Sequence, residues 1–394
     1  MRELRDSEVV VAGCGAISAV GGDVAALRHA LQNNVSGLRA SEKFPTPRFQ
    51  SNLVGAVPKN CWDKTPSNPN FSENPAWSLA AEALRQAGHS SKSALETIPA
   101  ARRALILSTT KANIHALELI SENRPCAAAA RRHLQANLLA EDLAAAGGAQ
   151  GPVQTISLAC VSGLVAISQA TKIIQRDEAD AVLVVGVDYL SEFVVAGFTA
   201  LKALDPLGCR PFDRDRSGLS PGEAGAALVL VRKNFAPEAA IKIQGFGGSN
   251  DANHLTGPSR DGSGLALAIR IALADAQLSP ADIDYIHAHG TGTPYNDAME
   301  SLALKTIFGD ACPPVSGSKG MLGHTLGAAG VIETIGCVLA IENDFLPGTP
   351  GLTRAAEGTP ASLVHAPRAA QLKNVLKLNT GFGGMNGALI LSHE

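Results

Sequence analysis

The sequence has 394 residues, of which 45% are hydrophobic, 4% aromatic and 18% charged, with a net charge of −3. This length exceeds an ordinary single domain, so we expect two core units or one large layered α/β body whose core consists mainly of Ala, Val, Leu and Ile. The small negative charge and the lack of a long basic run exclude nucleic acid and an anionic membrane as expected partners.

The chain begins M-R-E-L-R-D-S-E, with acids where a signal peptide needs a basic segment, and no stretch reaches the ~18 apolar residues of a membrane span. Its seven cysteines are odd in number, scattered and free of C-x-x-C, so the pattern indicates neither a disulfide framework nor a structural zinc site. We therefore expect a cytoplasmic protein with reduced thiols.

The first predicted elements are a strand over Glu8–Ala12, a turn at Gly13–Ser18 and a helix over Asp23–Gln32. Ser18 replaces the third glycine of a dinucleotide fingerprint, so Gly13 and Gly15 are expected only to make a tight turn. Residues 36–74, rich in Pro, Ser and Asn, are predicted to cross the surface. Next come a helix, a strand and an Ala/Leu-rich helix: Pro75–Ala87, Arg103–Ser108 and Ala127–Ala145.

The stretch Thr155–Ser168 reads T-I-S-L-A-C-V-S-G-L-V-A-I-S and places Cys160 where a short apolar strand turns into a helix over Val161–Gln175. At the first turn of a helix, unpaired N–H groups and the positive end of the dipole should lower the thiol pKa. Such a thiolate could form a covalent thioester. Inert buried cysteines are also common, so position alone leaves both interpretations open.

The rest of the chain repeats the pattern of its first part. A strand over Ala181–Val187, a turn-rich segment over Leu204–Gly225 and a strand over Ala226–Val231 precede a new strand at Ile241–Phe246, with a glycine turn at Gly247-Gly248. The later elements are a helix, a strand, a helix and two strands: Ser263–Ala276, Asp284–His287, Gly327–Ile341, Val375–Leu378 and Ala388–Leu391. This order suggests an internal duplication, with halves at 1–236 and 237–394.

The segment His287–Thr293, H-A-H-G-T-G-T, follows a strand end, where His289 would project from the rim at which α/β sites gather. An H-x-H pair with Asp297 and Glu300 nearby is also a metal pattern. Two ligands are too few to define a site, so we predict no metal.

Two further motifs lie near the end of the chain. Ser318–His324 reads S-K-G-M-L-G-H, and Lys319 and Glu333 are the only charges between Asp310 and Glu342, so they are expected to pair with each other. The glycine-rich turn at 379–387 would open backbone N–H groups to a bound oxyanion.

Taken together, these motifs resemble the β-ketoacyl-acyl-carrier-protein synthases, in the order and spacing of the elongating, two-histidine branch. Supporting signatures are C-R-P-F-D at Asp213, P-G-E-A-G at Glu223 and D-A-N-H-L-T near His254. The resemblance covers essentially the whole chain. It implies a thiolase-type fold with five layers, α-β-α-β-α, built from two similar βαβαβαββ halves and usually assembled as a homodimer.

The resemblance implies a decarboxylative Claisen condensation. Cys160 would take an acyl group from a phosphopantetheine thioester, and attack by a malonyl-derived carbanion would release a β-ketoacyl product and CO2. The partner would be an acyl carrier protein that brings its own 4′-phosphopantetheine, so no separate cofactor is expected. His289 and His324 would donate to the malonyl thioester oxygen, and Lys319, paired with Glu333, would orient them.

The same resemblance assigns the binding residues. The backbone N–H groups of Cys160 and Phe382 would form the oxyanion hole. Thr291 and Thr293 would line the pantetheine arm, and Phe382 would also gate the acyl pocket.

The chain departs from the family pattern at His287, where an acid is common, at Val161 and Ser162 after the nucleophile, at Met385, and at Ser108–Lys111. These changes leave fatty-acid synthesis and a polyketide or polyene pathway both open.

Four other functions compete with this one. A degradative thiolase would carry a cysteine in the final glycine turn, where this chain has Phe382, and an initiating synthase would use His and Asn, which His324 contradicts. The chain could be a subunit that is active only in a heterodimer with a nucleophile-less chain-length partner. A non-catalytic acyl-carrier-binding protein would not need a thiol, two histidines and a lysine together.

Overall fold

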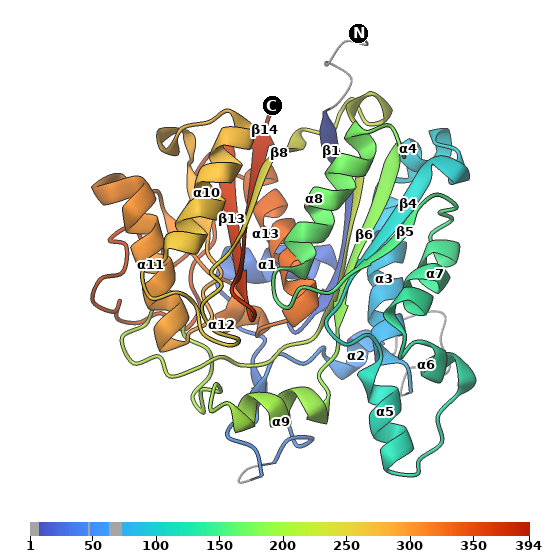
Figure 1. The fold of residues 1–394 in the computed structure, drawn as a ribbon, viewed down its shortest axis with the longest axis horizontal. Helices are drawn as coiled ribbons and strands as arrows, with labels where there is room; N and C mark the ends of the chain where they lie inside the picture. Colours follow the sequence, from blue (N-terminus) through green and yellow to red (C-terminus); the bar gives the residue numbers. More distant parts are fainter. Residues whose placement is uncertain (1–7, 46–47, 63–72) are drawn as a thin grey trace.

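A computed structural model describes residues 8–45, 48–62 and 73–394 (Figure 1). A ten-stranded mixed sheet runs through it in the order β10-β9-β13-β14-β8-β1-β7-β6-β4-β5. Its strands are Val9–Ser18 (β1), Arg103–Ser108 (β4), Val153–Ile156 (β5), Ala181–Asp188 (β6), Ala224–Arg232 (β7), Ile241–Asn250 (β8), Tyr285–His287 (β9), Val315–Ser316 (β10), Asn374–Gly381 (β13) and Met385–His393 (β14). Two small hairpin-like pairs are Arg39–Ala40 (β2) with Leu53–Val54 (β3), and Phe345–Leu346 (β11) with Arg368–Ala369 (β12).

The helices lie on both faces of this sheet and between its two parts. They are Val24–Asn33 (α1), Lys59–Trp62 (α2), Pro75–Ser90 (α3), Lys92–Thr97 (α4), Ile114–Ser121 (α5), Ala128–Arg132 (α6), Ala136–Ala146 (α7), Ser162–Gln175 (α8), Glu192–Ala200 (α9), Ser263–Ala276 (α10), Pro294–Phe308 (α11), Lys319–Leu322 (α12) and Ala329–Glu342 (α13). In the described part of the chain, every helix is too short or too polar to cross a bilayer.

The strand order repeats itself about the middle of the sheet. Outward from the centre, one half runs β1-β7-β6-β4-β5 and the other runs β8-β14-β13-β9-β10, with the same sequence of antiparallel and parallel pairings. The halves meet where Val10 of β1 pairs with Lys242 of β8. Each half has the chain order βαβαβαββ, which confirms the predicted fold of two similar units. The exact boundary between residues 236 and 237 stays a prediction.

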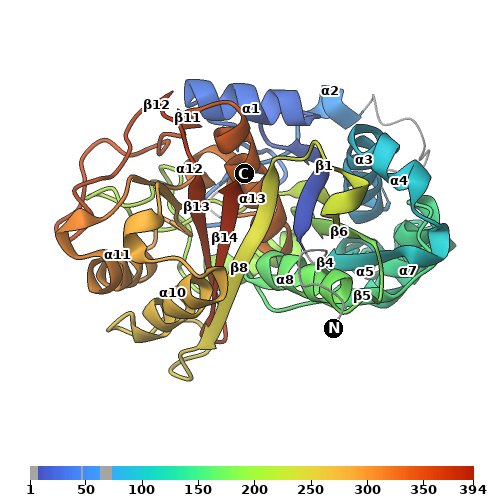
Figure 2. The same cartoon turned by 90° about the horizontal axis from the view of Figure 1, so that it is seen from above.

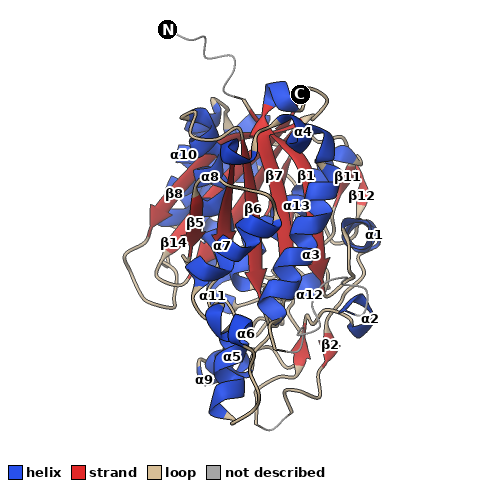
Figure 3. Cartoon of the chain, turned by 90° about the vertical axis from the view of Figure 1, so that its right-hand side faces the viewer, coloured by secondary structure: helices blue, strands red, loops and turns tan. Residues whose placement is uncertain are grey.

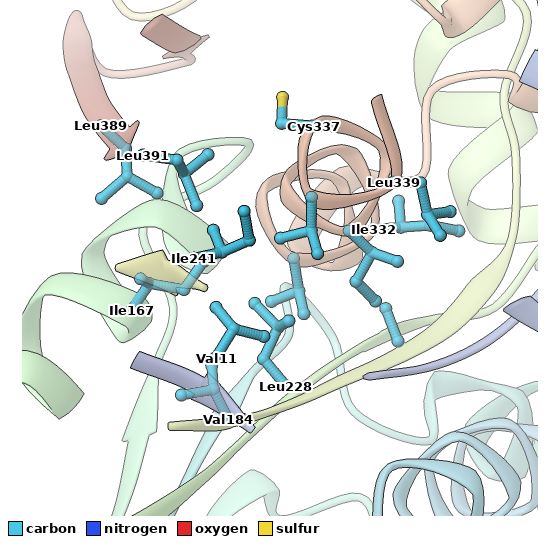
Figure 4. Packing of buried hydrophobic residues seen from close by; sticks show 14 of the residues in the cluster. Val11, Ile167, Val184, Leu228, Ile241, Ile332, Cys337, Leu339, Leu389 and Leu391 are labelled. Atoms are coloured by element: carbon cyan, nitrogen blue, oxygen red, sulfur yellow. The ribbon is translucent and has the colours of Figure 1, made fainter. Parts of the chain in front are cut away.

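Helices α8 and α13 form the layer between the two halves. They touch through glycines: a Cβ added to Gly163 would lie 2.7 Å from the Cα of Gly330. Helices α3 and α7 cover the outer face of the first half, and α10 and α11 that of the second, at opposite ends of the molecule (Figures 2 and 3). Apolar side chains from α8, α13 and both halves of the sheet, including Ile167, Ile332 and Leu389, form the central core (Figure 4).

The two predicted glycine turns are wrong, because Gly13 and Gly15 lie inside β1 and Gly247 and Gly248 lie inside β8. The glycines allow an outer helix to press against the strand. A Cβ on Gly15 would lie 1.9 Å from the carbonyl oxygen of Ala83, and one on Gly247 would lie 1.9 Å from that of Ala268. The two halves therefore use glycine in the same way.

We expect Gly15→Ala to lower the free energy of unfolding by about 1–3 kcal/mol, because the added methyl group overlaps the backbone of α3. Gly88→Ala is the matched control on α3: nothing lies within 4 Å of its added Cβ, and alanine should stabilise the helix by about 0.5–1 kcal/mol. Chemical denaturation of the purified variants measures both. Equal midpoints would contradict the packing argument.

The helices differ from the prediction in two ways. Ala127–Ala145 is two helices, α6 and α7, and six helices were not predicted: α2, α4, α5, α9, α11 and α12. The interruption contains the buried His133, whose Nε2 lies 2.8 Å from Oδ2 of Asp142 and whose ring stacks on Trp77. These contacts fix a turn where the Ala/Leu composition alone favours a continuous helix.

The surface excursion at 36–74 is only partly exposed. Phe44, Phe49 and Val54 are buried against Leu190 and Leu204, so this segment closes a small core below α9. Residues 46–47 and 63–72 of the excursion lie outside the described residues.

Candidate active site

The predicted site residues line one cavity of about 720 Å³, except Lys319 and Glu333, which lie behind its wall. They reach it from segments far apart in the sequence: the turn after β5, the loop after β9, the segment between α12 and α13, and the turn after β13. The cavity is lined, among others, by Thr110, Lys111, Cys160, Phe193, Phe198, His289, Thr291, Thr293, His324 and Phe382. Because the two halves of the fold contribute different residues, the site forms only when both halves are folded together.

Cys160 lies at a sharp bend two residues before the first residue of α8, slightly earlier than the predicted first turn. Ala159 makes the bend with φ of +48°, a conformation that residues other than glycine rarely adopt. The hydroxyl of Ser162 donates to the carbonyl of Ala159 (2.6 Å) and accepts from the amide of Leu158 (2.8 Å). Ser162, one of the departures from the family pattern, therefore holds the bend that presents the thiol.

His324 faces the thiol, with Nε2 2.9 Å from Sγ of Cys160. The amide of Leu326 donates to Nδ1 of His324 (3.4 Å), so Nε2 carries the ring proton and points at the sulfur. Burial, followed by the charge of Lys319, lowers the pKa of His324 to about 3, which keeps the ring neutral.

His289 has its ring at a right angle to that of His324, with centroids 5.3 Å apart. Its Nδ1 lies 3.2 Å from Nζ of Lys319 and 3.0 Å from Nδ2 of Asn379. Both of these groups donate, so Nδ1 accepts, and the proton sits on Nε2 at the cavity side. Burial, Lys319 and then His324 hold the pKa of His289 well below its usual value. Two neutral imidazoles thus offer N–H groups to one space.

Lys319 and Glu333 form the predicted pair, with Nζ 2.5 Å from Oε1 and both side chains buried. The structure adds two partners that the sequence reasoning missed. Lys377 lies 2.9 Å from the other oxygen of Glu333, and Asn379 donates to that oxygen at 3.2 Å. A signal was present, since Lys377 is a charge inside the buried strand N-V-L-K-L-N. Although burial opposes it, the two lysines hold the pKa of Glu333 far below its usual value.

A buried carboxylate at the end of β6 was also missed. Asp188 accepts from the amide of Gly327 (2.6 Å) and from the hydroxyl of Thr110 (2.8 Å), and it pairs with Lys111 at 3.0 Å. It thereby ties the loop after β4 to the segment that leads into α13. The departure at Ser108–Lys111 therefore places an ammonium group in the cavity wall.

The acids near the H-x-H pair shape a loop. Glu300 accepts from the amides of His289 (2.5 Å) and Gly290 (2.9 Å), and Asp297 accepts from that of Thr291 (3.1 Å). His287 does not form a metal-ligand pair with His289. Its Nδ1 lies 3.2 Å from the carbonyl oxygen of Ala288, and burial lowers the pKa of His287 to about 3.

The residues whose spacing suits a metal ion differ from those that the sequence pattern suggested. Among the described residues, the group with spacing suited to a cation is Cys160, His289 and His324, whose ligand atoms lie within 4.8 Å of one another. Asp297 and Glu300 are not part of it. The absence of a metal therefore stays a prediction, now for this cluster of three.

The remaining predicted residues line the same cavity. The hydroxyls of Thr291 and Thr293 lie 2.8 Å apart. Phe382 is 41% exposed, and its ring centroid lies 6.2 Å from that of Phe198. A Cβ added to Gly381 would come within 3.2 Å of the amide nitrogen of Cys160, so the backbone before Phe382 runs beside the thiol. The two-amide oxyanion hole stays a prediction.

The expected lowering of the Cys160 pKa is wrong. Burial of the thiol raises its pKa to about 12, and the charge of Lys319 acts in the opposite direction without overcoming it. The sequence indicates only a helix start at Cys160, whereas the folded chain removes the sulfur from water. The resting thiol is therefore protonated at neutral pH.

We expect alkylation of Cys160 by iodoacetamide to accelerate about tenfold for each pH unit between pH 7 and pH 9, because only the thiolate reacts and its fraction grows in this way below a high pKa. The mass of the Cys160 peptide after timed exposure gives the rate. Glutathione is the control, and its rate should begin to level off near its own pKa, about 8.5–9. A Cys160 rate already constant above pH 7 would contradict the protonated thiol.

Sequence comparison finds relatives over the whole chain. The chain is 34% identical over 412 residues to the 3-oxoacyl-[acyl-carrier-protein] synthase 2 of Vibrio cholerae, covering 97% of this chain and 98% of that protein. It is 37% identical over 268 residues to the tetracenomycin polyketide synthase ketoacyl synthase alpha subunit of Streptomyces glaucescens. The chain spans about two thirds of the length of several such relatives; alignments with proteins of Streptomyces halstedii and Streptomyces cyaneus cover 64% and 65% of their lengths.

Solved structures of ketosynthases also superpose on nearly the whole chain. The ishigamide ketosynthase/chain length factor superposes with a TM-score of 0.89 at 31% identity, covering 98% of this chain and 99% of that one. A ketosynthase in complex with its chain length factor from Xenorhabdus doucetiae gives 0.86 at 29% identity over the full length of both chains. Family models match residues 6–236 as the β-ketoacyl synthase N-terminal domain and 240–353 as its C-terminal domain. The chain, with its thiol and two imidazoles around one cavity, belongs to the β-ketoacyl synthase family.

Proposed function

We propose that the protein is an acyltransferase, a 3-oxoacyl-[acyl-carrier-protein] synthase, which elongates an acyl chain by decarboxylative condensation with malonyl-acyl carrier protein. One observation carries the proposal: Sγ of Cys160 and the rings of His289 and His324 face one cavity, with Nε2 of His324 2.9 Å from the sulfur. A nucleophile beside two N–H donors fits both halves of the reaction.

In the first step, the sulfur of Cys160 attacks the thioester carbon of the acyl carrier, and the carrier thiol leaves with the cysteine proton. The backbone amides of Cys160 and Phe382 are proposed to hold the oxyanion. Acyl groups then occupy the cavity toward α9, whose Phe198 faces Phe382.

In the second step, the malonyl thioester loses CO2, and its electron pair moves to the thioester oxygen. The Nε2–H groups of His289 and His324 are proposed to stabilise that charge. The carbanion attacks the acyl carbonyl on Cys160, a carbon–carbon bond forms, and the cysteine sulfur leaves as a thiolate that takes up a proton from solvent. Thr291 and Thr293 are proposed to guide the pantetheine arm, which arrives on the carrier, so the protein needs no cofactor of its own.

The proposed partners are an acyl carrier protein and a second ketosynthase-like chain, either identical or a chain-length factor. Support comes from a solved structure, 26% identical to this chain, of a type II polyketide synthase acyl-carrier protein in complex with its ketosynthase, and from the two ketosynthase and chain length factor structures. Activity that requires a chain length factor is the second candidate. We also propose that residues 1–236 form the half with the nucleophile, that 237–394 form the half with the two histidines and Lys319, and that the protein is cytoplasmic.

Acyl loading tests the proposal. After incubation with acyl-carrier thioesters of several chain lengths, the intact protein should gain one acyl mass, and peptide mapping should place it on Cys160. The Cys160→Ala variant is the control and should gain none. An acyl group on Cys209 or Cys337 would contradict the assignment.

A further inference from the structure

Lys377 is a buried cation that the reaction, as described so far, does not use. It lies in the middle of β13 between Leu376 and Leu378, and all three side chains are fully buried. A buried ammonium group strongly disfavours folding unless it is paired. Its partners are Oε2 of Glu333 at 2.9 Å and the carbonyl of Leu378. The fold thus retains a costly charge directly behind the site.

The contacts lead from Lys377 to the ring of His289. Oε1 of Glu333 accepts from Lys319, and its Oε2 accepts from Lys377 and Asn379. Lys319 and Asn379 are in turn the two groups that reach Nδ1 of His289, at 3.2 and 3.0 Å. The position of one carboxylate therefore fixes both donors, and Lys377 holds one side of that carboxylate.

The charges around His289 also connect Lys377 to this ring. Burial lowers the pKa of Lys377, and the charge of Glu333 acts in the opposite direction. Lys319 and Glu333 would cancel each other, whereas the trio with a protonated Lys377 has a net charge of +1. The titratable groups facing His289 come from every neighbouring element: Lys319 (α12), Glu333 (α13), Lys377 (β13), His287 (β9), Glu300 (α11), His324 and Cys160. Within this set, Lys377 adds a positive charge that opposes protonation of His289.

We propose that Lys377 is a positioning residue for decarboxylation: it fixes Glu333 so that Lys319 and Asn379 hold Nδ1 of His289 and leave its Nε2–H for the substrate oxygen. The inference rests on the proposed function of His289. It assigns to β13 a part in the chemistry, although Lys377 itself does not touch the substrate.

The test measures CO2 release from malonyl-acyl carrier protein and acyl loading of Cys160 for Lys377→Met, across a range of pH. Met has a similar length, and Glu333 keeps Lys319 as a partner, so no charge is left unpaired. We expect decarboxylation to fall about 10- to 100-fold, less than for loss of a donor that touches the substrate. The acid limb of its pH profile should move to higher pH, because removing the cation raises the pKa of His289, and acyl loading should change little.

Lys373→Met is the matched control, because Lys373 is exposed immediately before β13. If Lys377→Met does not fold, Asn379→Ala tests the same contacts without removing a charge and should also lower decarboxylation. An unchanged rate and acid limb in a folded Lys377→Met would overturn the inference while leaving the proposed function intact. Equal loss of loading and decarboxylation would also overturn it, in favour of a structural role. Failure of the unaltered protein to decarboxylate would instead count against the proposed function.

Discussion

Replacing Cys160 with Gln is expected to abolish condensation while malonyl decarboxylation persists or rises. The substitution removes the nucleophile, so no acyl-enzyme can form. It also places a neutral amide carbonyl where the acyl-enzyme carbonyl would sit, and His289 and His324 remain in place. Released CO2 and the intact mass of the enzyme, measured on the same sample, separate the two half-reactions.

Cys312→Ala is a suitable control, because Cys312 does not line the cavity and its loss should leave both half-reactions unchanged. Condensation that survives in Cys160→Gln would show that another group carries the acyl chain. Loss of decarboxylation together with condensation would show that the thiol acts in both steps.

The second large effect is expected from His324→Ala. This variant keeps Cys160 able to accept an acyl group but removes one of two N–H donors to the developing enolate. Loss of such a donor costs about 2–4 kcal/mol, so decarboxylation should fall about 30- to 1,000-fold. The rate of CO2 release gives the size of the loss, and the acyl-enzyme mass shows whether loading survives.

His324→Gln retains an N–H donor on a side chain of similar reach and should lose less activity than His324→Ala. If His324→Ala decarboxylates normally while Cys160→Gln does not, the division of labour between thiol and imidazoles is reversed. If the Gln and Ala variants lose the same activity, a donated N–H is not what His324 supplies.

The motifs of the site could be predicted from the sequence because each follows the end of a strand or opens a helix. His289 and Phe382 follow β9 and β13, which are parallel neighbours whose ends meet at one edge of the sheet, and Cys160 follows β5 in the other half. The pairing of Lys319 with Glu333 followed from charge alone in an apolar stretch. These inferences needed local sequence and one general rule of α/β folds.

What the sequence reasoning missed depends on contacts between distant segments. Lys377 is 58 residues from Lys319 in numbering, and nothing local shows that both reach one carboxylate. The pKa of Cys160 was predicted in the wrong direction because the helix start is visible in the sequence and the burial of the sulfur is not. Gly15 was read as a turn because the helix that needs its missing side chain lies some 70 residues away.

The crossing of α8 and α13 at Gly163 and Gly330 affects the geometry of the active site from a distance. Cys160 precedes α8 and His324 precedes α13, so the distance between Sγ and Nε2 depends on how closely these two helices approach each other. A methyl group at the crossing would act as a spacer and open that separation without altering a single reacting atom. The distance between nucleophile and donor thus depends on two residues that have no side chain, together with the contacts of Ser162 that hold the bend at Cys160.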